Sequence, residues 1–466
     1  MRKVFVLSII LALGLNVLGQ DLQPDTLTLI NDSVVVSDSA VEQPDSVAPE
    51  IEQTTEEGQP MQSGLSGESQ KTWELRGSLR ELAKVFSESP NKVDLLETRL
   101  KLELISTLGK NSAFRALGYA IYRYPQKQLC FDLKEAYLDY YTKYVDLRLG
   151  QQTNSWGKAD ELNPTDVLNP QDMSNITEDK SLRKTGIFQA KADIKLYDFI
   201  LTALWKPVFE YMQVPALDSR WAFFSIPNTI SLPAPVYPEN KFTNTEWAFK
   251  LARTISSVDF SLSYFDGWDN IFTPVMSVNA STRQVTLDKL ITHRTKMFGA
   301  DFATSIASVG FWGEGAYFLT EDNEGVNPLI KNPYIQFVLG ADYQFKNNYK
   351  LNIQYFQEVS TKTDDDAEKT SEEKLLSKMG IGLPLKQAIT CRLEKKFGAA
   401  EEFKGELFGI YDLKYNGIYL VPRFSYTPED GFNIEVGYNI FKGDDDSFWA
   451  RFKNNDQAYL KCTYSF

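Results

Sequence analysis

The last eleven residues of the chain, DQAYLKCTYSF (Asp456–Phe466), alternate apolar and polar side chains with a period of two. This period is typical of a β-strand that has one apolar and one polar face. The apolar face carries every second residue up to the end of the chain: Ala458, Leu460, Cys462, Tyr464 and Phe466. Such a face must be covered, either by a protein core or by lipid.

The N-terminal segment, residues 1–19, has the pattern of a secretory signal peptide. Arg2 and Lys3 precede a long apolar run, and small residues lie before a cleavage point near Gly19. We therefore expect the remaining chain to be exported. After this segment no stretch approaches the roughly 18 apolar residues of a membrane-spanning helix, so the sequence does not predict a helical membrane protein.

Residues 20–70 differ in composition from the rest of the chain. They contain eleven Asp and Glu residues and no Lys, Arg or aromatic residue. Such a segment cannot bury enough apolar surface to offset the entropy lost on ordering, so we expect a disordered acidic tail in the periplasm. The tail accounts for most of the net charge of −13, which is therefore not evidence of a binding preference.

Residues 71–466 form a long series of alternating segments. Examples are WELRGSLR (73–80), LLETRLKLEL (95–104) and FNIEVGYNI (432–440). A soluble sandwich of two sheets would alternate in the same way. However, many of these segments reach about ten residues, the length that a tilted strand needs to cross a bilayer, whereas strands of globular proteins usually have about five or six.

The lengths of the connections support the same interpretation. With eighteen strands, alternate connections are short, as at 107–112, 398–402 and 427–431, and the others are mostly long, as at 153–183 and 212–242. This count treats LDKLITHRTKMFGADFATS (287–305) as one long strand. Short turns on one rim and long loops on the other predict an all-β fold, a transmembrane antiparallel β-barrel of 16–18 strands, best 18, in a Gram-negative type of outer membrane.

The C-terminal strand fits this prediction. A period-two apolar face is tolerated next to lipid when closure of the barrel satisfies every backbone group. Tyr464 and Phe466 resemble the end of outer-membrane barrels, which implies that the barrel-assembly machinery recognises them as an assembly signal.

Three segments carry a resemblance to a known family. They are DLRLGQQTNSWGKADELNPTDVLNPQD (146–172), KMFGADFATS (296–305) and YNIFKGDDDSFWARFKNNDQAYLKCTYSF (438–466). Together they resemble a porin-like outer-membrane family of uncharacterised function, distantly akin to alginate-export-type porins. The chain departs from that pattern at Gln151 and at Lys158, where an Arg and an acidic residue are expected. The resemblance implies fold and location, and supplies almost no chemistry.

The charged residues on the polar faces predict a wet lumen of mixed sign. On the lipid face near mid-bilayer each charge would cost up to about 2–4 kcal/mol. A barrel of 16 to 18 strands is wide enough for an aqueous channel. The predicted pore-lining residues are Arg76, Arg80, Glu97, Arg99, Lys101, Glu103, Asp146, Arg148, Lys191, Asp193, Glu435 and Lys461.

A doubled Asn-Pro turn is the most unusual local feature, with NPTD at 163–166 and NPQD at 169–172. Because Asn-Pro pairs start turns, one interpretation is a compact double turn in an outer loop. The other is a loop that folds inward and narrows the pore. The residues of this candidate constriction are Trp156, Asn163, Asp166, Asn169 and Asp172. The spacing of the acidic residues is not that of an EF-hand, and no metal site is predicted.

The sequence indicates no enzyme. The single histidine, His293, accompanies neither a G-x-S-x-G elbow nor a H-E-x-x-H motif. We expect no cofactor and no nucleic-acid partner, because no basic patch has interleaved aromatic residues. The predicted function is a passive or loop-gated pore for a small solute, with outer-membrane lipid and lipopolysaccharide around it. The alternatives are a surface-binding or adhesion barrel, and a scaffold whose acidic tail recruits a periplasmic partner.

Overall fold

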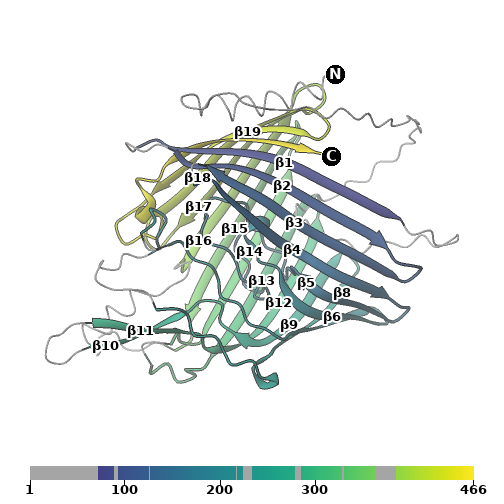
Figure 1. Ribbon diagram of the computed structural model, residues 1–466, viewed down its shortest axis with the longest axis vertical. Helices are drawn as coiled ribbons and strands as arrows, with labels where there is room; N and C mark the ends of the chain where they lie inside the picture. The colour runs from purple at the N-terminus through teal and green to yellow at the C-terminus, as the bar shows by residue number, and fades with distance from the viewer. Residues whose placement is uncertain are drawn as a thin grey trace. The chain divides into compact units, whose positions relative to one another are not determined.

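The computed structural model describes residues 72–88, 93–124, 126–216, 218–223, 233–278, 285–327, 330–362 and 385–466. The predicted signal peptide (1–19) and all of residues 20–71, which include the predicted acidic tail (20–70), lie outside these ranges. Within them, eighteen antiparallel strands form one sheet, drawn in Figure 1. In the described part of the chain, no helix is long and apolar enough to cross a membrane.

The first nine strands of the sheet are β1 (Trp73–Phe86), β2 (Val93–Thr107), β3 (Ser112–Tyr124), β4 (Gln128–Tyr141), β5 (Val145–Gln152), β6 (Ile187–Leu196), β7 (Phe199–Lys206), β8 (Glu246–Ile255) and β9 (Val258–Trp268). The other nine are β12 (Arg294–Ile306), β13 (Val309–Thr320), β14 (Tyr334–Gln344), β15 (Tyr349–Ser360), β16 (Gln387–Phe397), β17 (Phe403–Asp412), β18 (Gly417–Glu429), β19 (Phe432–Lys442) and β20 (Gln457–Ser465). The short helices are α2 (Lys180–Arg183), η1 (Phe242–Asn244) and η2 (Trp449–Phe452).

The sheet closes on itself. Each strand pairs with its sequence neighbours, β9 pairs with β12, and β20 lies between β19 and β1. Closure leaves no sheet edge that would have to be satisfied in lipid. The predicted fold, a closed antiparallel barrel of eighteen strands, is confirmed.

One element of the prediction is wrong. Residues 287–305 are not one strand. Strand β11 (Val285–Ile291) lies outside the barrel sheet, and the chain joins that sheet only at β12. Strand β11 pairs with β10 (Thr273–Val278) in a separate two-stranded sheet. The hydroxyl of Thr292 donates to the carbonyl of Asp269 (2.6 Å), which holds the chain where it changes direction. Since this hairpin lies inside a long connection, the alternation of short and long connections is kept.

The register separates two faces of the wall. Leu102 of β2 lies opposite Gly77 and Gly118 and is 42 % exposed, whereas the neighbouring Lys101 faces Ser78 on the other side of the sheet. The outward side of the other strands is also apolar, with exposed residues such as Leu75, Leu149 and Leu339. A closed barrel with an apolar outer surface is typical of proteins whose strands face lipid. The chain is therefore an outer-membrane type of barrel.

The C-terminal strand completes this wall. The amide of Phe466 donates to the carbonyl of Gly77 (2.8 Å), and the amide of Gly77 donates to the carbonyl of Phe466 (2.9 Å). The Phe466 ring covers Gly77 so closely that a Cβ at this position would clash with it. Tyr464 stacks beside the same ring, with 6.3 Å between ring centroids. The last residue of the chain is thus part of the hydrogen-bonded ladder.

We predict opposite outcomes for two neighbouring substitutions in β2. Leu102→Arg places a charge in lipid and should destabilise the barrel by about 2–4 kcal/mol, whereas Lys101→Ala should change stability by less than about 1 kcal/mol. Urea unfolding in lipid vesicles, with heat-modifiable gel migration as the measure of folding, gives both values. Equal effects would show that the two faces are wrongly assigned.

We also predict that deletion of Phe466, or Tyr464→Asp, lowers the outer-membrane level of the protein several-fold while export continues. Each change removes part of the apolar end of β20 that pairs with β1. Cell fractionation and heat-modifiability measure the folded protein in the outer membrane. Normal amounts after both changes would rule out a role for this end in assembly.

Candidate functional site

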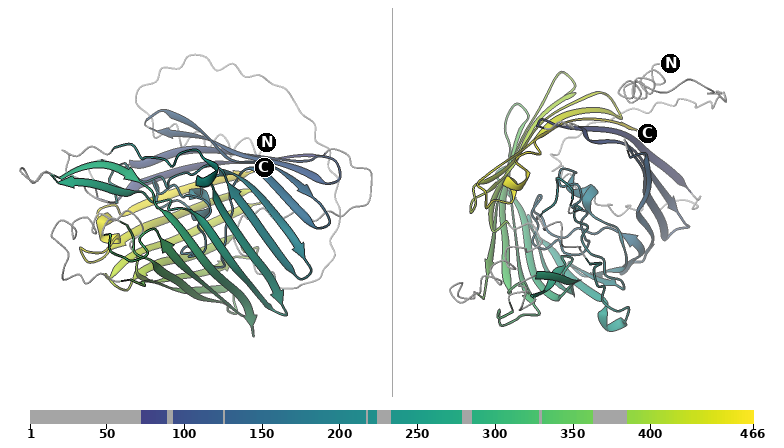
Figure 2. Two further views of the ribbon diagram at one scale, coloured as in Figure 1. Left: turned by 90° about the horizontal axis from the view of Figure 1, so that it is seen from below. Right: turned by 60° about the vertical axis from the view of Figure 1, so that its left-hand side comes forward.

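The connection between β5 and β6, residues 153–186, is the candidate functional site. We call it the inner loop, because its side chains and backbone contact inward-facing residues of many strands. The right-hand view of Figure 2 shows teal segments of chain within the ring of strands. Three polar attachments and one apolar attachment hold the inner loop to the wall.

The apolar attachment is Trp156. Its side chain is 5 % exposed and belongs to a buried cluster with residues of the inner wall. The wall residues of this cluster are Leu204, Ala248, Phe265, Met297, Ala316 and Phe318. They come from β7, β8, β9, β12 and β13, so this indole fixes the start of the inner loop against that part of the barrel.

Glu314 of β13 makes the first polar attachment. Its buried carboxylate accepts hydrogen bonds from the backbone amides of Lys158 and Ala159 and from the hydroxyl of Thr165 (3.1 Å). Gly157 allows this approach, because its φ of +92° favours glycine and a Cβ there would clash with the carboxylate. A wall carboxylate is therefore satisfied by the loop backbone rather than by a cation.

Asp160 makes the second polar attachment, to β15 and β16. Its backbone exchanges two hydrogen bonds with the Gln354 side chain (2.9 and 2.7 Å). Its carboxylate lies 3.1 Å from a guanidinium nitrogen of Arg392. Arg392 also contacts Glu406 (3.0 Å), which in turn binds Arg423 (3.0 Å). The Asp160 carboxylate thus adds a negative charge next to Arg392 and Arg423, two guanidinium groups that share Glu406.

Glu178 makes the third polar attachment, on β1 and β2. Its two carboxylate oxygens accept from two nitrogens of Arg80 (2.9 and 3.0 Å), and Arg99 lies 3.3 Å away. Next to it, Lys84 donates to the Thr177 hydroxyl (2.7 Å). Burial alone would raise the pKa of the Glu178 carboxyl, but Arg80, with Arg99 and Lys84, holds this pKa well below its usual range. The carboxylate therefore stays charged at any physiological pH.

The attachments lie on opposite sides of the ring. Strands β1 and β2 are separated from β13 by many strands in both directions around the sheet. The inner loop starts on β5, contacts the wall at β13, β15 and β16, reaches β1 and β2, and returns to β6. It therefore crosses the space that the barrel encloses.

The doubled Asn-Pro turn lies within this crossing. Asp166 binds Lys184 (2.8 Å), and the buried Asn169 donates to the carbonyls of Gln152 (3.0 Å) and Thr185 (2.8 Å). Asn163 donates to the carbonyl of Ala159 (2.6 Å), and Asp172 accepts from the amide of Ser174 (2.9 Å). These polar groups hold the loop in its own shape. Among the described residues, no cluster of three or more His, Cys, Asp or Glu side chains could hold a metal ion.

The remaining residues predicted from the polar faces lie on the inner side of the wall, mostly in pairs. Arg80 binds Glu97 (2.9 Å), and Lys461 binds Glu435 (2.9 Å). Further pairs, with their distances, are Arg76–Glu74 (2.6 Å), Arg115–Glu103 (2.7 Å), Arg148–Asp139 (2.7 Å), Lys195–Asp146 (2.8 Å) and Lys191–Asp193 (3.2 Å). The structure therefore brings these charges together along one inner wall.

Sequence reasoning placed Arg80 and Arg99 on the inner wall but missed the other wall residues that hold the loop. Glu314, Gln354 and Arg392 occupy polar positions of alternating strands, so their inward direction follows from the period of two. The partners of these residues cannot be predicted from the period of two, because contacts such as that of Glu314 with Ala159 join residues far apart in the chain. Glu178 lies in the loop and has no sequence signal at all.

A second layer covers the inner loop on the long-loop side. The amide of Met173 donates to the carbonyl of Gln213 (2.8 Å) in the connection that follows β7. Beyond it, Trp221 packs on Phe86 and Phe452, with ring centroids 6.1 and 5.7 Å apart. The described loops of this rim therefore bury an apolar cluster above the charged part of the wall.

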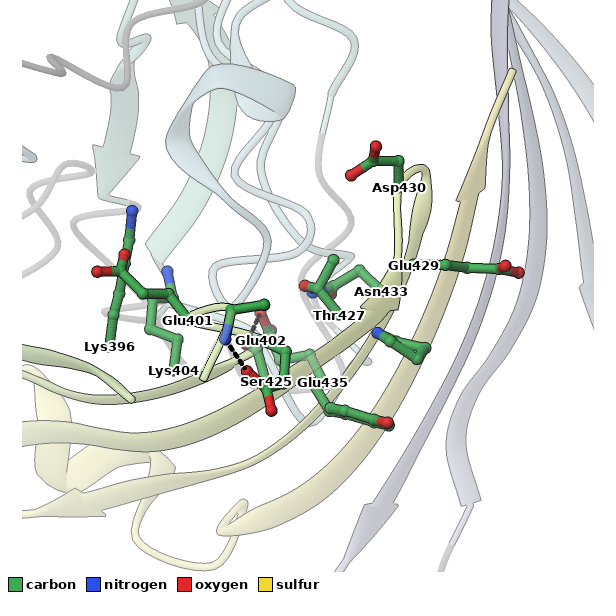
Figure 3. Close-up of a pocket in the computed structure, with 13 residues that line it drawn as sticks. Lys396, Glu401, Glu402, Lys404, Ser425, Thr427, Glu429, Asp430, Asn433 and Glu435 are labelled. Atoms are coloured by element: carbon green, nitrogen blue, oxygen red, sulfur yellow. Dashed lines mark hydrogen bonds between the residues drawn. The ribbon is translucent and has the colours of Figure 1, made fainter. Parts of the chain in front are cut away.

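A polar cavity lies at the opposite rim, beside the short turns after β16 and β18. Its volume is about 800 Å³, and Figure 3 shows its lining residues. Lys396 and Lys404 lie directly opposite each other on β16 and β17, and Glu402 and Glu435 also line it. The mouth on this side carries charges of both signs.

Comparison with known proteins gives a likeness in fold. OpdQ of Pseudomonas aeruginosa is 9 % identical over 85 % of this chain and 97 % of its own, with a TM-score of 0.51. OccAB2 of Acinetobacter baumannii is 10 % identical over 84 % of this chain and 98 % of its own, with a TM-score of 0.48. A mutant porin of Rh. blastica is 11 % identical over 85 % of this chain and 100 % of its own, with a TM-score of 0.40. No family model and no curated protein matches the sequence. At these identities the OpdQ likeness supports the barrel fold alone.

We predict that Glu178→Gln loosens the inner loop. The change removes the charge that Arg80 and Arg99 share, and hydrogen bonds to charged groups contribute about 1.5–3 kcal/mol, so amide exchange across 174–183 should rise about ten-fold or more. Hydrogen–deuterium exchange of the folded barrel measures this rise.

The matched control is Asp179→Asn. Asp179 is the next residue, its side chain is 47 % exposed, and it lies 3.8 Å from Lys461. We expect little change in exchange, because a distant and exposed ion pair contributes at most about 1 kcal/mol. Equal exchange in the two variants would show that Glu178 does not hold the loop.

Proposed function

We propose that the protein is an outer-membrane channel for small hydrophilic solutes, and that the inner loop sets the width of its passage. The observation that carries this proposal is the attachment of one loop to opposite sides of the wall, through Glu314, Arg392 and Arg80. A loop held in this way divides the interior of a wide barrel into a narrower passage. The polar inner wall supports diffusion of solutes that keep their hydration.

The inner wall also bears on the class of solute. Guanidinium and carboxylate groups alternate along it, as in Arg148 with Asp139 and Arg115 with Glu103. A wall of mixed sign favours polar solutes without selecting strongly for either charge. Passive diffusion, with the loop as a fixed or movable constriction, is the mechanism that this arrangement supports best.

The predicted family resemblance and the two alternative functions from the sequence analysis bear on this proposal. The resemblance to a porin-like family of uncharacterised function stays a prediction, and it bears on fold and location only. The adhesion barrel and the scaffold with an acidic tail remain the alternatives, since both need the barrel as an anchor rather than as a passage. Conductance separates a channel from these two.

We predict that deletion of Ala159–Asp179 raises single-channel conductance several-fold. The deletion removes the contacts of Ala159 and Thr165 with Glu314 and the attachments to Arg392 and Arg80, and it leaves every strand of the barrel in place. The deletion keeps every strand pairing of the closed sheet, and water that enters the widened interior can solvate the charges of Glu314, Arg392 and Arg80, so the variant should still insert. Planar bilayers measure conductance, and liposome swelling measures the size of solute admitted.

Two outcomes would contradict the proposed function. The intact, folded protein could show no channel, or the deletion variant could insert normally and conduct no better than the parent. In either case the inner loop would not limit a passage, and the surface-binding alternative would be favoured.

A further inference from the structure

The outer face of the barrel carries an aromatic belt near the long-loop ends of β7, β8 and β9. Trp205 and Trp247 are cross-strand partners with ring centroids 6.2 Å apart, and Phe242 lies 6.2 Å from Trp247. The next outward row contains Phe249, Tyr264 and Phe298, which lie opposite one another on β8, β9 and β12. Such belts mark the boundary between acyl chains and lipid headgroups.

Lys296 of β12 lies in this belt. In the ladder it is the partner of Asp266, which is the partner of Trp247, so the three residues share one outward row. Its side chain is exposed, and the outward residue that follows it, Phe298, is 49 % exposed to the surroundings of the barrel. The ammonium group therefore lies on the lipid-facing side at the height of the outer headgroups.

The acidic neighbour of Lys296 is already engaged. Asp266 accepts a hydrogen bond from Arg294 (2.7 Å) and one from the Tyr264 hydroxyl (3.3 Å). Arg294 is held in this place because it also donates to the carbonyls of Thr243 (3.4 Å) and Thr245 (3.1 Å). The side chain of Lys296 consequently has no hydrogen bond or ion pair with any residue that the structure describes.

Three other cationic side chains that point outward from the strands each have a partner. Lys442 binds Asp456 (3.0 Å), and Arg253 binds Asp198 (2.9 Å). Lys395, near the short-turn rim, donates to the Tyr349 hydroxyl (2.9 Å). The belt thus contains a cation whose neighbouring carboxylate is occupied, and this arrangement leaves a net positive charge at the depth of lipid phosphates.

We propose that Lys296 binds a phosphate group of a phosphorylated glycolipid in the outer leaflet, the lipid A part of lipopolysaccharide. The charge is complementary, because lipid A carries phosphate at the headgroup boundary where the belt places Lys296. The Arg294–Asp266 pair positions the site by keeping the carboxylate away from the ammonium group. The aromatic row beneath it offers a flat apolar surface for the acyl chains.

The test uses the full chain in detergent micelles, with bisphosphorylated lipid A and the same lipid A after removal of its phosphates as probes. Native mass spectrometry gives the fraction bound at each lipid concentration. The parent protein should bind the phosphorylated form more tightly. Lys296→Gln should weaken this binding about five-fold, the contribution of one cation near an anionic lipid surface.

Two further variants keep the test decisive if Lys296→Gln folds poorly. Lys296→Arg should bind like the parent. Arg294→Gln should weaken binding although Lys296 is present, because Asp266 then becomes free to neutralise it. Lys395→Gln is the matched control, since it removes one outward lysine at the other rim and should leave binding unchanged.

Four results would overturn the proposal. These are parent-like binding by Lys296→Gln, equal binding of the dephosphorylated lipid, an equal loss in Lys395→Gln, or phosphatidylglycerol binding as tightly as lipid A. The last result would show a site for any anionic headgroup rather than for the glycolipid.

Discussion

The cost of placing a charge in lipid decides where this protein keeps its ionic groups. Near mid-bilayer that cost reaches about 2–4 kcal/mol for Arg and Lys on the lipid face. With a side-chain period of two, the charged residues of the strands are therefore placed mainly on the inner row. The inner row of β1 and β2 shows the result, because Arg80, Glu97 and Arg99 lie side by side and neutralise one another in part.

A charged inner wall then requires partners, and the inner loop supplies several of them. Removing one partner of a buried ion pair is strongly destabilising, by about 3–5 kcal/mol, because the other charge is left uncompensated. Arg80 and Arg99 use Glu178, Arg392 uses Asp160, and Glu314 uses backbone amides. The position of the loop is thus a consequence of the wall, and the narrowing of the interior is a consequence of the loop.

Periodicity predicts one part of this arrangement well. The faces of Leu102, Lys101 and the C-terminal strand follow from alternation alone, and the best estimate of eighteen barrel strands follows from alternation together with the connection lengths. The prediction failed at residues 287–305, which belong to two strands, β11 and β12, with different partners. A period of two records which way a side chain points, and it contains no information on which strand lies alongside.

The same limit applies to the candidate site. Trp156 and the Asn-Pro turns could be singled out from composition and turn chemistry, because those signals are local. The contacts of Glu314 with Lys158 and of Arg392 with Asp160 could not, because they depend on how the closed sheet brings distant segments together.

The most direct test of this account is a cross-link between the inner loop and the opposite wall. Asp160→Cys and Arg392→Cys would be introduced after Cys130, Cys391 and Cys462, which are free thiols, are replaced by serine. Treatment of the folded protein in outer membranes with a short bismaleimide should join the two positions, while each single-cysteine control stays unlinked. A folded barrel in which both thiols react but no link forms would show that the loop does not cross the interior.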